Sequence, residues 1–112
     1  MTLENIYTIL TGITGFSDKV AYRAFPAKSA PALPFIAYID RGSDNFDADN
    51  KVYSPWERVD IELYTEDKDE ASEALIETAL KNAGLCFEKT DETYIESEQM
   101  LENVWEIKFL KG

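Results

Sequence analysis

The residues best suited to chemistry are aspartates gathered in one short polar segment. Asp44, Asp47 and Asp49 fall within residues 43–51, and oxygen-rich loops of this kind hold Ca²⁺ in EF-hands. In the EF-hand register that starts at Asp47, Asp49 takes the third ligand position. The register then fails, with a lysine at the fifth position, a valine at the glycine position and an arginine where the bidentate glutamate belongs. The sequence therefore favours a solvated acidic loop, and we expect no metal and no cofactor.

Groups that act as nucleophiles or bases are scarce. The 112-residue chain has no histidine, so Ser-His-Asp and Cys-His systems are impossible. Its single cysteine, Cys86, has Glu88 as the nearest charge, and we expect a small core hydrophobe rather than a thiolate. Carboxylates such as Asp60 and Glu62 alternate with apolar residues, which predicts that they face solvent. We therefore expect a protein that is not an enzyme.

Acidic residues outnumber basic ones by 22 to 11, which gives a formal net charge of −11. Residues 1–39 hold two acids and three bases, so the acidic surplus belongs to residues 40–112. A nucleic-acid backbone is held by clustered Lys and Arg, so we expect no tight nucleic-acid binding. The longest apolar stretch, residues 32–39, is far below the roughly 20 residues that span a bilayer. No signal peptide is evident, and we expect a cytosolic protein without membrane contact.

Three aromatic residues lie in or beside the acidic segment: Phe46, Tyr53 and Trp56. Aromatic side chains are enriched at the energetic centres of protein interfaces. Ordinary packing of the loop onto its own sheet is an equally good explanation of the same pattern. The interaction hypothesis combines these aromatics with the aspartates Asp44, Asp47 and Asp49, as a subunit contact or an insertion into a partner.

The first half of the chain predicts one helix and two strands. A helix is predicted from Leu3 to Leu10, with Thr2 as its N-cap, because Leu3, Ile6, Tyr7 and Leu10 recur at the three-four spacing of one buried face. A strand is expected over residues 19–25, followed by an extended connector with two prolines. Residues 35–39 form a nearly continuous apolar run, which predicts a central strand that residues 40–43 end.

The second half predicts a long strand, a helix and further strands. Period-two alternation favours a strand from about residue 52 to residue 64, with a bulge, kink or edge at Pro55. A helix is expected to open at Asp67 and to end before Gly84. Glu77 is expected to face solvent, and the predicted buried stripe consists of Ala71, Leu75, Ile76, Ala79, Leu80 and Ala83. Short strands over residues 85–89 and 93–96, separated by a turn, and a final strand over 101–110 follow. We predict a single α+β domain over residues 1–112, with a mixed or antiparallel sheet of four to five strands and two helices packed on one face.

The order of these patterns resembles a known family. An opening helix around residues 6–10 leads to a connector that ends in Pro31-Ala32-Leu33-Pro34-Phe35-Ile36-Ala37-Tyr38. After the acidic loop come Arg58-Val59-Asp60-Ile61-Glu62-Leu63-Tyr64, a helix, and Tyr94-Ile95-Glu96-Ser97-Glu98 before a final strand. Over nearly its whole length, the chain resembles the small tail-completion, or tail-terminator, proteins of long-tailed bacteriophages and prophages.

The resemblance implies a structural role in virion assembly. It implies an oligomeric ring of six copies that caps the tail tube and carries out head-tail joining. The implied partners are further copies of the chain, the major tail protein and a head-completion protein, and DNA passes through the ring. The implied location is the host cytoplasm during assembly and the virion tail afterwards. The family offers no catalytic residues to carry over.

Two other functions remain open from the residues. An acidic inhibitor that mimics DNA would occupy a basic groove on a host protein, and the acidic residues of the segment 40–112 suit it if they share one face. An enzyme that works through carboxylates and a metal is the third hypothesis, and the failed calcium register speaks against it.

Overall fold

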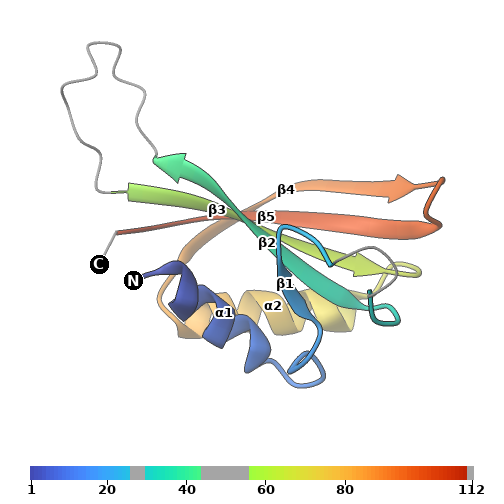
Figure 1. Cartoon of the computed structure of the whole chain (residues 1–112), viewed down its shortest axis with the longest axis horizontal. Helices are drawn as coiled ribbons and strands as arrows, with labels where there is room; N and C mark the ends of the chain where they lie inside the picture. The colour runs from blue at the N-terminus through green and yellow to red at the C-terminus, as the bar shows by residue number, and fades with distance from the viewer. Residues whose placement is uncertain (26–29, 44–55, 111–112) are drawn as a thin grey trace, which may run out of the picture.

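A computed structural model describes residues 1–25, 30–43 and 56–110 of the chain (Figure 1). Within these ranges it contains two helices and five strands. In chain order they are α1 (Leu3–Thr11), β1 (Val20–Tyr22), β2 (Phe35–Ser43), β3 (Trp56–Thr65), α2 (Glu70–Asn82), β4 (Cys86–Ile95) and β5 (Met100–Leu110). The expected strand bend at Pro55 falls outside the described residues.

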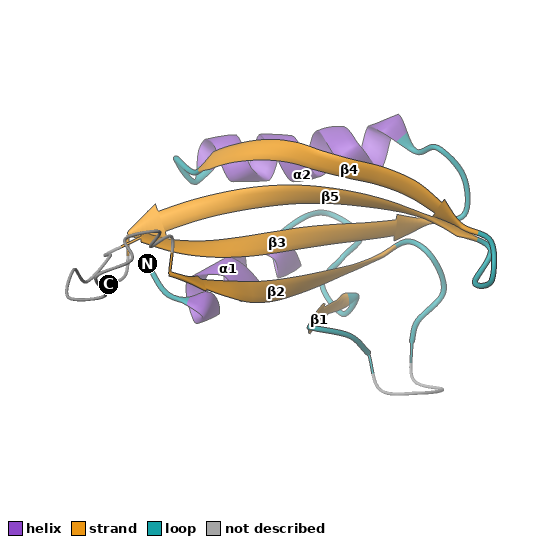
Figure 2. Ribbon diagram, turned by 90° about the horizontal axis from the view of Figure 1, so that it is seen from above, coloured by secondary structure: helices purple, strands orange, loops and turns teal. Residues whose placement is uncertain are grey.

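The strands form one mixed sheet with the order β1-β2-β3-β5-β4. Only β1 and β2 are parallel, and the other neighbours are antiparallel. Both helices lie on the same face of the sheet, α1 near β1 and β2 and α2 near β4, so no described helix covers the other face, which we call the uncovered face (Figures 1 and 2). The predicted α+β class, with a mixed sheet and two helices on one face, is confirmed.

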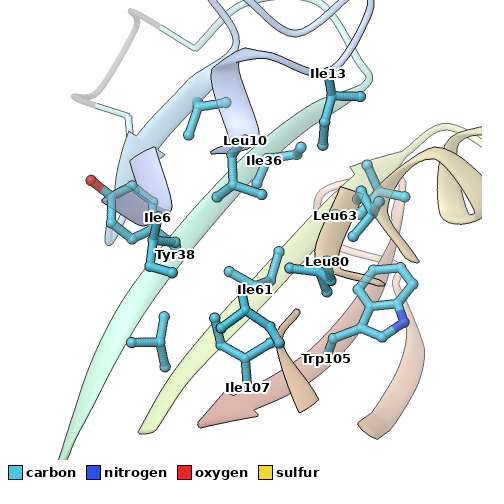
Figure 3. Packing of buried hydrophobic residues seen from close by; sticks show 14 of the residues in the cluster. Ile6, Leu10, Ile13, Ile36, Tyr38, Ile61, Leu63, Leu80, Trp105 and Ile107 are labelled. Carbon is cyan, nitrogen blue, oxygen red and sulfur yellow. The ribbon is translucent and has the colours of Figure 1, made fainter. Parts of the chain in front are cut away.

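The core lies between the sheet and the two helices (Figure 3). It combines Ile6 and Leu10 of α1 with Ile76 and Leu80 of α2, all fully buried. Alternate residues of the central strands point into it, namely Val59, Ile61, Leu63, Trp105, Ile107 and Phe109. Because these residues are two apart along β3 and β5, the intervening polar side chains point to the uncovered face.

Local signals explain where the helices begin and end. Thr2 caps α1 in a reciprocal capping box with Asn5, as the sequence predicts for the cap residue. The predicted start of α2 at Asp67 is wrong, because the N-cap is Asp69, whose carboxylate accepts the backbone N–H of Ser72 at 3.0 Å. Gly84 follows the helix with φ +74°, a left-handed conformation that suits a residue without Cβ.

The strand predicted over residues 19–25 is too long, because β1 ends at Tyr22 and Arg23 has a left-handed φ of +70°. Two further predicted strand ends are wrong, because sheet pairing carries the chain past polar residues. The sequence predicts that residues 40–43 end the strand, but β2 continues to Ser43 through a register shift between Asp40 and Gly42. β4 runs without a turn from Cys86 to Ile95, with a register shift between Lys89 and Asp91. A bulge absorbs one extra residue while the ladder with the neighbouring strand continues on both sides.

The buried stripe of α2 is rotated from its expected position. The sequence predicted that Ala71 and Leu75 are buried, whereas both are exposed and Ser72 is buried. Glu77 was expected to face solvent, but its Oε2 accepts the indole N–H of Trp105 at 2.8 Å. This bond joins the helix to the middle of β5, so Glu77 faces the sheet although periodicity places it on the solvent side.

Candidate functional site: the uncovered face and the edges of the sheet

The uncovered face of the sheet gathers carboxylates from three neighbouring strands. Residues directly opposite one another on paired strands point to the same face. The registers of β3, β5 and β4 therefore bring six acidic residues together, and we call this set the acidic face. Its members are Asp60, Glu62, Glu88, Asp91, Glu102 and Glu106. Asp60 and Glu62 point away from the core, but the prediction that both face solvent is wrong for Glu62, which the neighbouring strands bury.

One row of this face places like charges directly across from one another. Glu106 on β5 lies opposite Asp60 on β3 and also opposite Glu88 on β4. Like charges at directly opposite positions destabilise a sheet. Arg41 relieves part of the repulsion, because its Nε lies 2.8 Å from Asp60 Oδ2. The carboxylates of Glu106 and Glu88 thus remain opposite one another in the isolated chain.

Next to this row, two glutamates share one tyrosine hydroxyl. The Tyr64 hydroxyl lies 2.9 Å from Glu62 Oε1 and 2.7 Å from Glu102 Oε2. A hydroxyl has one proton, so it donates to only one carboxylate at a time. Glu62 retains 9% exposure, and its burial raises the pKa of that carboxyl, with the nearby charge of Glu102 adding to the effect. Burial also raises the pKa of Tyr64.

The Glu62→Gln variant is expected to be more stable than the wild type at neutral pH by about 1 kcal/mol, the size of one net hydrogen bond. A raised folded-state pKa means that the wild type gains stability as pH falls and loses it as pH rises through that pKa. The advantage of the variant should therefore shrink in acid. Urea unfolding at pH 7 and pH 4 measures the difference in unfolding free energy between the variant and the wild type. A difference that grows in acid would contradict the raised pKa of Glu62.

Beside the row formed by Asp60, Glu106 and Glu88, the end of the uncovered face is basic rather than acidic. Arg58 and Lys108 lie directly opposite each other, and Cys86 lies opposite Lys108. Cys86 is exposed, so its expected place in the core is wrong. The strand begins one residue before Phe87, whose half-buried side chain takes the core-facing position instead.

On the helix-covered side, four charged residues tie β4 to the start of α2. Lys68 Nζ lies 3.0 Å from Glu73 and 2.8 Å from Glu92. Lys89 Nζ lies 3.1 Å from Glu73 and 2.6 Å from Glu92. The two ammonium groups hold the pKa of Glu92 down at about 2, mainly through their hydrogen bonds. These ion pairs link β4 both to α2 and to the loop that precedes α2.

Acid is expected to remove the contribution of Glu92. Because its folded-state pKa lies below its ordinary value of 4.5, the stability that it adds is present above pH 4.5 and is lost as pH falls toward 2. The difference in unfolding free energy between wild type and Glu92→Gln should be constant near neutral pH and should vanish near pH 2. Urea midpoints along this pH series measure it, and a difference that is independent of pH would contradict the pairing.

The opposite edge of the sheet carries exposed tyrosines whose positions the sequence does not predict. Tyr7 and Tyr22 are exposed by 43% and 40%, and both contact the ring of the buried Tyr38. Periodicity placed Tyr7 on the buried side of α1, although that side is completed by Ile6 and Leu10. The missed signal is the pairing of β1 with β2, which brings Tyr22 beside Tyr38.

Of the six residues in the predicted interaction loop, the structure places only Trp56. It is the first residue of β3, is 43% exposed and lies opposite Leu110. Phe46, Tyr53, Asp44, Asp47 and Asp49 lie outside the described residues, so their role stays a prediction. Trp56 itself flanks the basic row of Arg58 and Lys108 on the uncovered face.

Among the described residues, no group of three or more Cys, Asp or Glu side chains is arranged to hold a metal ion. No helix in the same part of the chain has the length and apolar character needed to cross a membrane. Neither a scan against models of protein families nor a search of curated proteins finds a match to this chain.

Proposed function

We propose that this chain is a non-enzymatic structural protein of a phage or prophage tail, which caps the tail tube as a ring and joins the tail to the head. The proposal starts from the resemblance of the sequence to tail-terminator proteins. The fold class that the resemblance implies agrees with the observed α+β architecture. Fold class alone does not identify a function, so the proposal needs an observation at the surface.

The acidic face is the observation that carries the proposal. A row of carboxylates from Asp60 through Glu106 to Glu88 costs stability in the isolated chain. A ring whose lumen is lined by carboxylates repels the phosphates of DNA, so DNA passes without adhering. In this assembly the uncovered face borders the lumen, while the helices occupy the outer side.

Gene neighbourhood and electron microscopy test this function. Genes for a head-completion protein and a major tail protein should flank the gene for this chain. Tubes assembled from that major tail protein and mixed with the purified chain should show added density at one end in negative stain. Tubes that remain bare at a large excess of the chain would overturn the proposal.

A second function is favoured by the same surface. An acidic inhibitor that mimics DNA needs carboxylates on one face, and the registers of β3, β5 and β4 supply them. It predicts a complex with a basic host protein that weakens steeply with salt. If the chain mimics DNA, replacement of Glu88 and Glu106 by glutamine should weaken that complex. If the purified chain instead caps tail tubes, the structural role is favoured.

A further inference from the structure

The sheet ends in two edges of different chemistry. Among the described strands, β4 forms one edge and pairs only with β5, through nine of its ten residues. Alternate backbone N–H and C=O groups of such a strand point away from the sheet, which makes it a template for pairing or contact. At the other edge, β1 spans only three residues and pairs with β2 over residues 36–38. Figure 2 shows the two edges on opposite sides of the molecule.

The β1 side has the composition of an interface centre. Tyr22 packs edge-to-face on Tyr38 at 5.2 Å between ring centroids, and Tyr7 lies 6.3 Å from the same ring. The Arg23 guanidinium carbon lies 5.8 Å from the centroid of Tyr22. Tyrosine and arginine are enriched among residues that dominate binding energy. We call Tyr7, Tyr22, Tyr38 and Arg23 the tyrosine edge.

Arg23 is held in an unfavourable backbone conformation at this edge. Its φ is +70°, in the left-handed region that residues with a side chain rarely adopt. Its backbone N–H donates to the carbonyl oxygen of Tyr38 at 2.8 Å, which fixes the turn after β1. Strained residues of this kind cluster at functional sites, so the conformation supports a role for the exposed Arg23 side chain.

The β4 side is complementary in charge and in hydrogen bonding. Glu88 and Asp91 give it two carboxylates outside the ion-pair cluster, whereas Glu92 is already paired with Lys68 and Lys89. Every residue from Glu88 to Tyr94 is exposed. Phenol hydroxyls and guanidinium N–H groups donate hydrogen bonds, whereas carboxylates only accept them. The tyrosine edge therefore offers the donors that the acidic β4 edge accepts.

We propose that the tyrosine edge of one copy binds the β4 edge of a second copy, head to tail. The inference deepens the proposed function, since it names the contact by which a ring forms. The two edges differ and lie on opposite sides of the sheet, so each copy uses one edge for each neighbour. Repetition of such a contact closes a ring when the rotation between neighbours divides a full turn.

Two edge variants and their mixture test the contact. The tyrosine-edge variant carries Tyr22→Ala and Arg23→Ala, and the β4-edge variant carries Glu88→Lys and Asp91→Lys. In sedimentation velocity, the wild type should form oligomers as concentration rises, and each variant alone should associate at least tenfold more weakly. An equimolar mixture should form dimers and stop there, because each variant keeps the edge that the other has lost.

Circular dichroism shows whether the variants keep their fold, and a milder variant guards against misfolding. Tyr7→Phe with Tyr22→Phe removes only the two hydroxyls and should weaken association several-fold without change in the spectrum. The proposal is overturned if the wild type stays monomeric at millimolar concentration, or if the mixture of variants forms no dimer. Capping of tail tubes by both edge variants would also overturn it while leaving the proposed function intact. Oligomers that use these edges but ignore tail tubes would overturn the function instead.

Discussion

Replacement of Trp105 by alanine is expected to lower the free energy of unfolding by about 3–5 kcal/mol. Trp105 is fully buried in the middle of β5, opposite Ile61 on β3 and Lys89 on β4. Its removal leaves a cavity under α2, and it also deprives the half-buried carboxylate of Glu77 of the indole donor at 2.8 Å. Domains of this size are stable by about 5–15 kcal/mol, so the loss is a large share of the total.

Urea unfolding followed by circular dichroism measures the effect. The second tryptophan provides a matched control, because Trp56 is exposed at the start of β3 and its replacement by alanine should cost about 1 kcal/mol or less. Trp105→Phe retains most of the ring volume and loses the indole donor. A double-mutant cycle of Trp105→Phe with Glu77→Ala then isolates the hydrogen bond. Equal losses for both tryptophans would contradict the assigned core.

Replacement of Asn103 by leucine is expected to raise the free energy of unfolding by about 1–3 kcal/mol. Asn103 is fully buried on the helix-facing side of β5, opposite Leu63 and Glu92. Among the described residues, neither its amide oxygen nor its amide nitrogen has a hydrogen-bond partner. A buried polar group without a partner forfeits its hydration, and leucine has nearly the same branched shape without that cost.

Thermal and urea denaturation of Asn103→Leu test this expectation. Asn103→Asp is the control, and it should lower the free energy of unfolding, because it places a negative charge in the same buried position. Asn82→Leu, at the exposed end of α2, should change stability little. A loss of stability in Asn103→Leu would show that the amide is satisfied in solution and would refute the prediction.

Much of the fold follows from local patterns. Period-two alternation of Trp105, Ile107 and Phe109 identifies β5 and its buried face, because side-chain direction in a strand depends only on position along the chain. The break at Gly84 likewise follows from a backbone conformation that glycine adopts at least cost. By contrast, the sequence wrongly predicts a turn at residues 90–92, which belong to β4. Polar residues in an edge strand give no local sign that they pair with β5.

The candidate surfaces could be predicted only in part. Alternation correctly turns Asp60 and Glu62 away from the core, but it gives no information about their neighbours on other strands. Burial of Glu62 to 9% exposure depends on the strands beside it. The exposed tyrosines were missed for the same reason, because β1 and α1 meet at Tyr38 through tertiary packing. The predicted loop aromatics other than Trp56 lie outside the described residues.

The sequence by itself determined the acidic surplus, the absence of histidine, the α+β class and the alternation that points acids away from the core. Only the tertiary structure decided that Asp60, Glu106 and Glu88 stand in one row across three strands. Strand register sets this row, and register depends on pairing between segments that are far apart in the chain. The same pairing leaves one acidic edge and one tyrosine edge on opposite sides of the sheet, which composition cannot reveal.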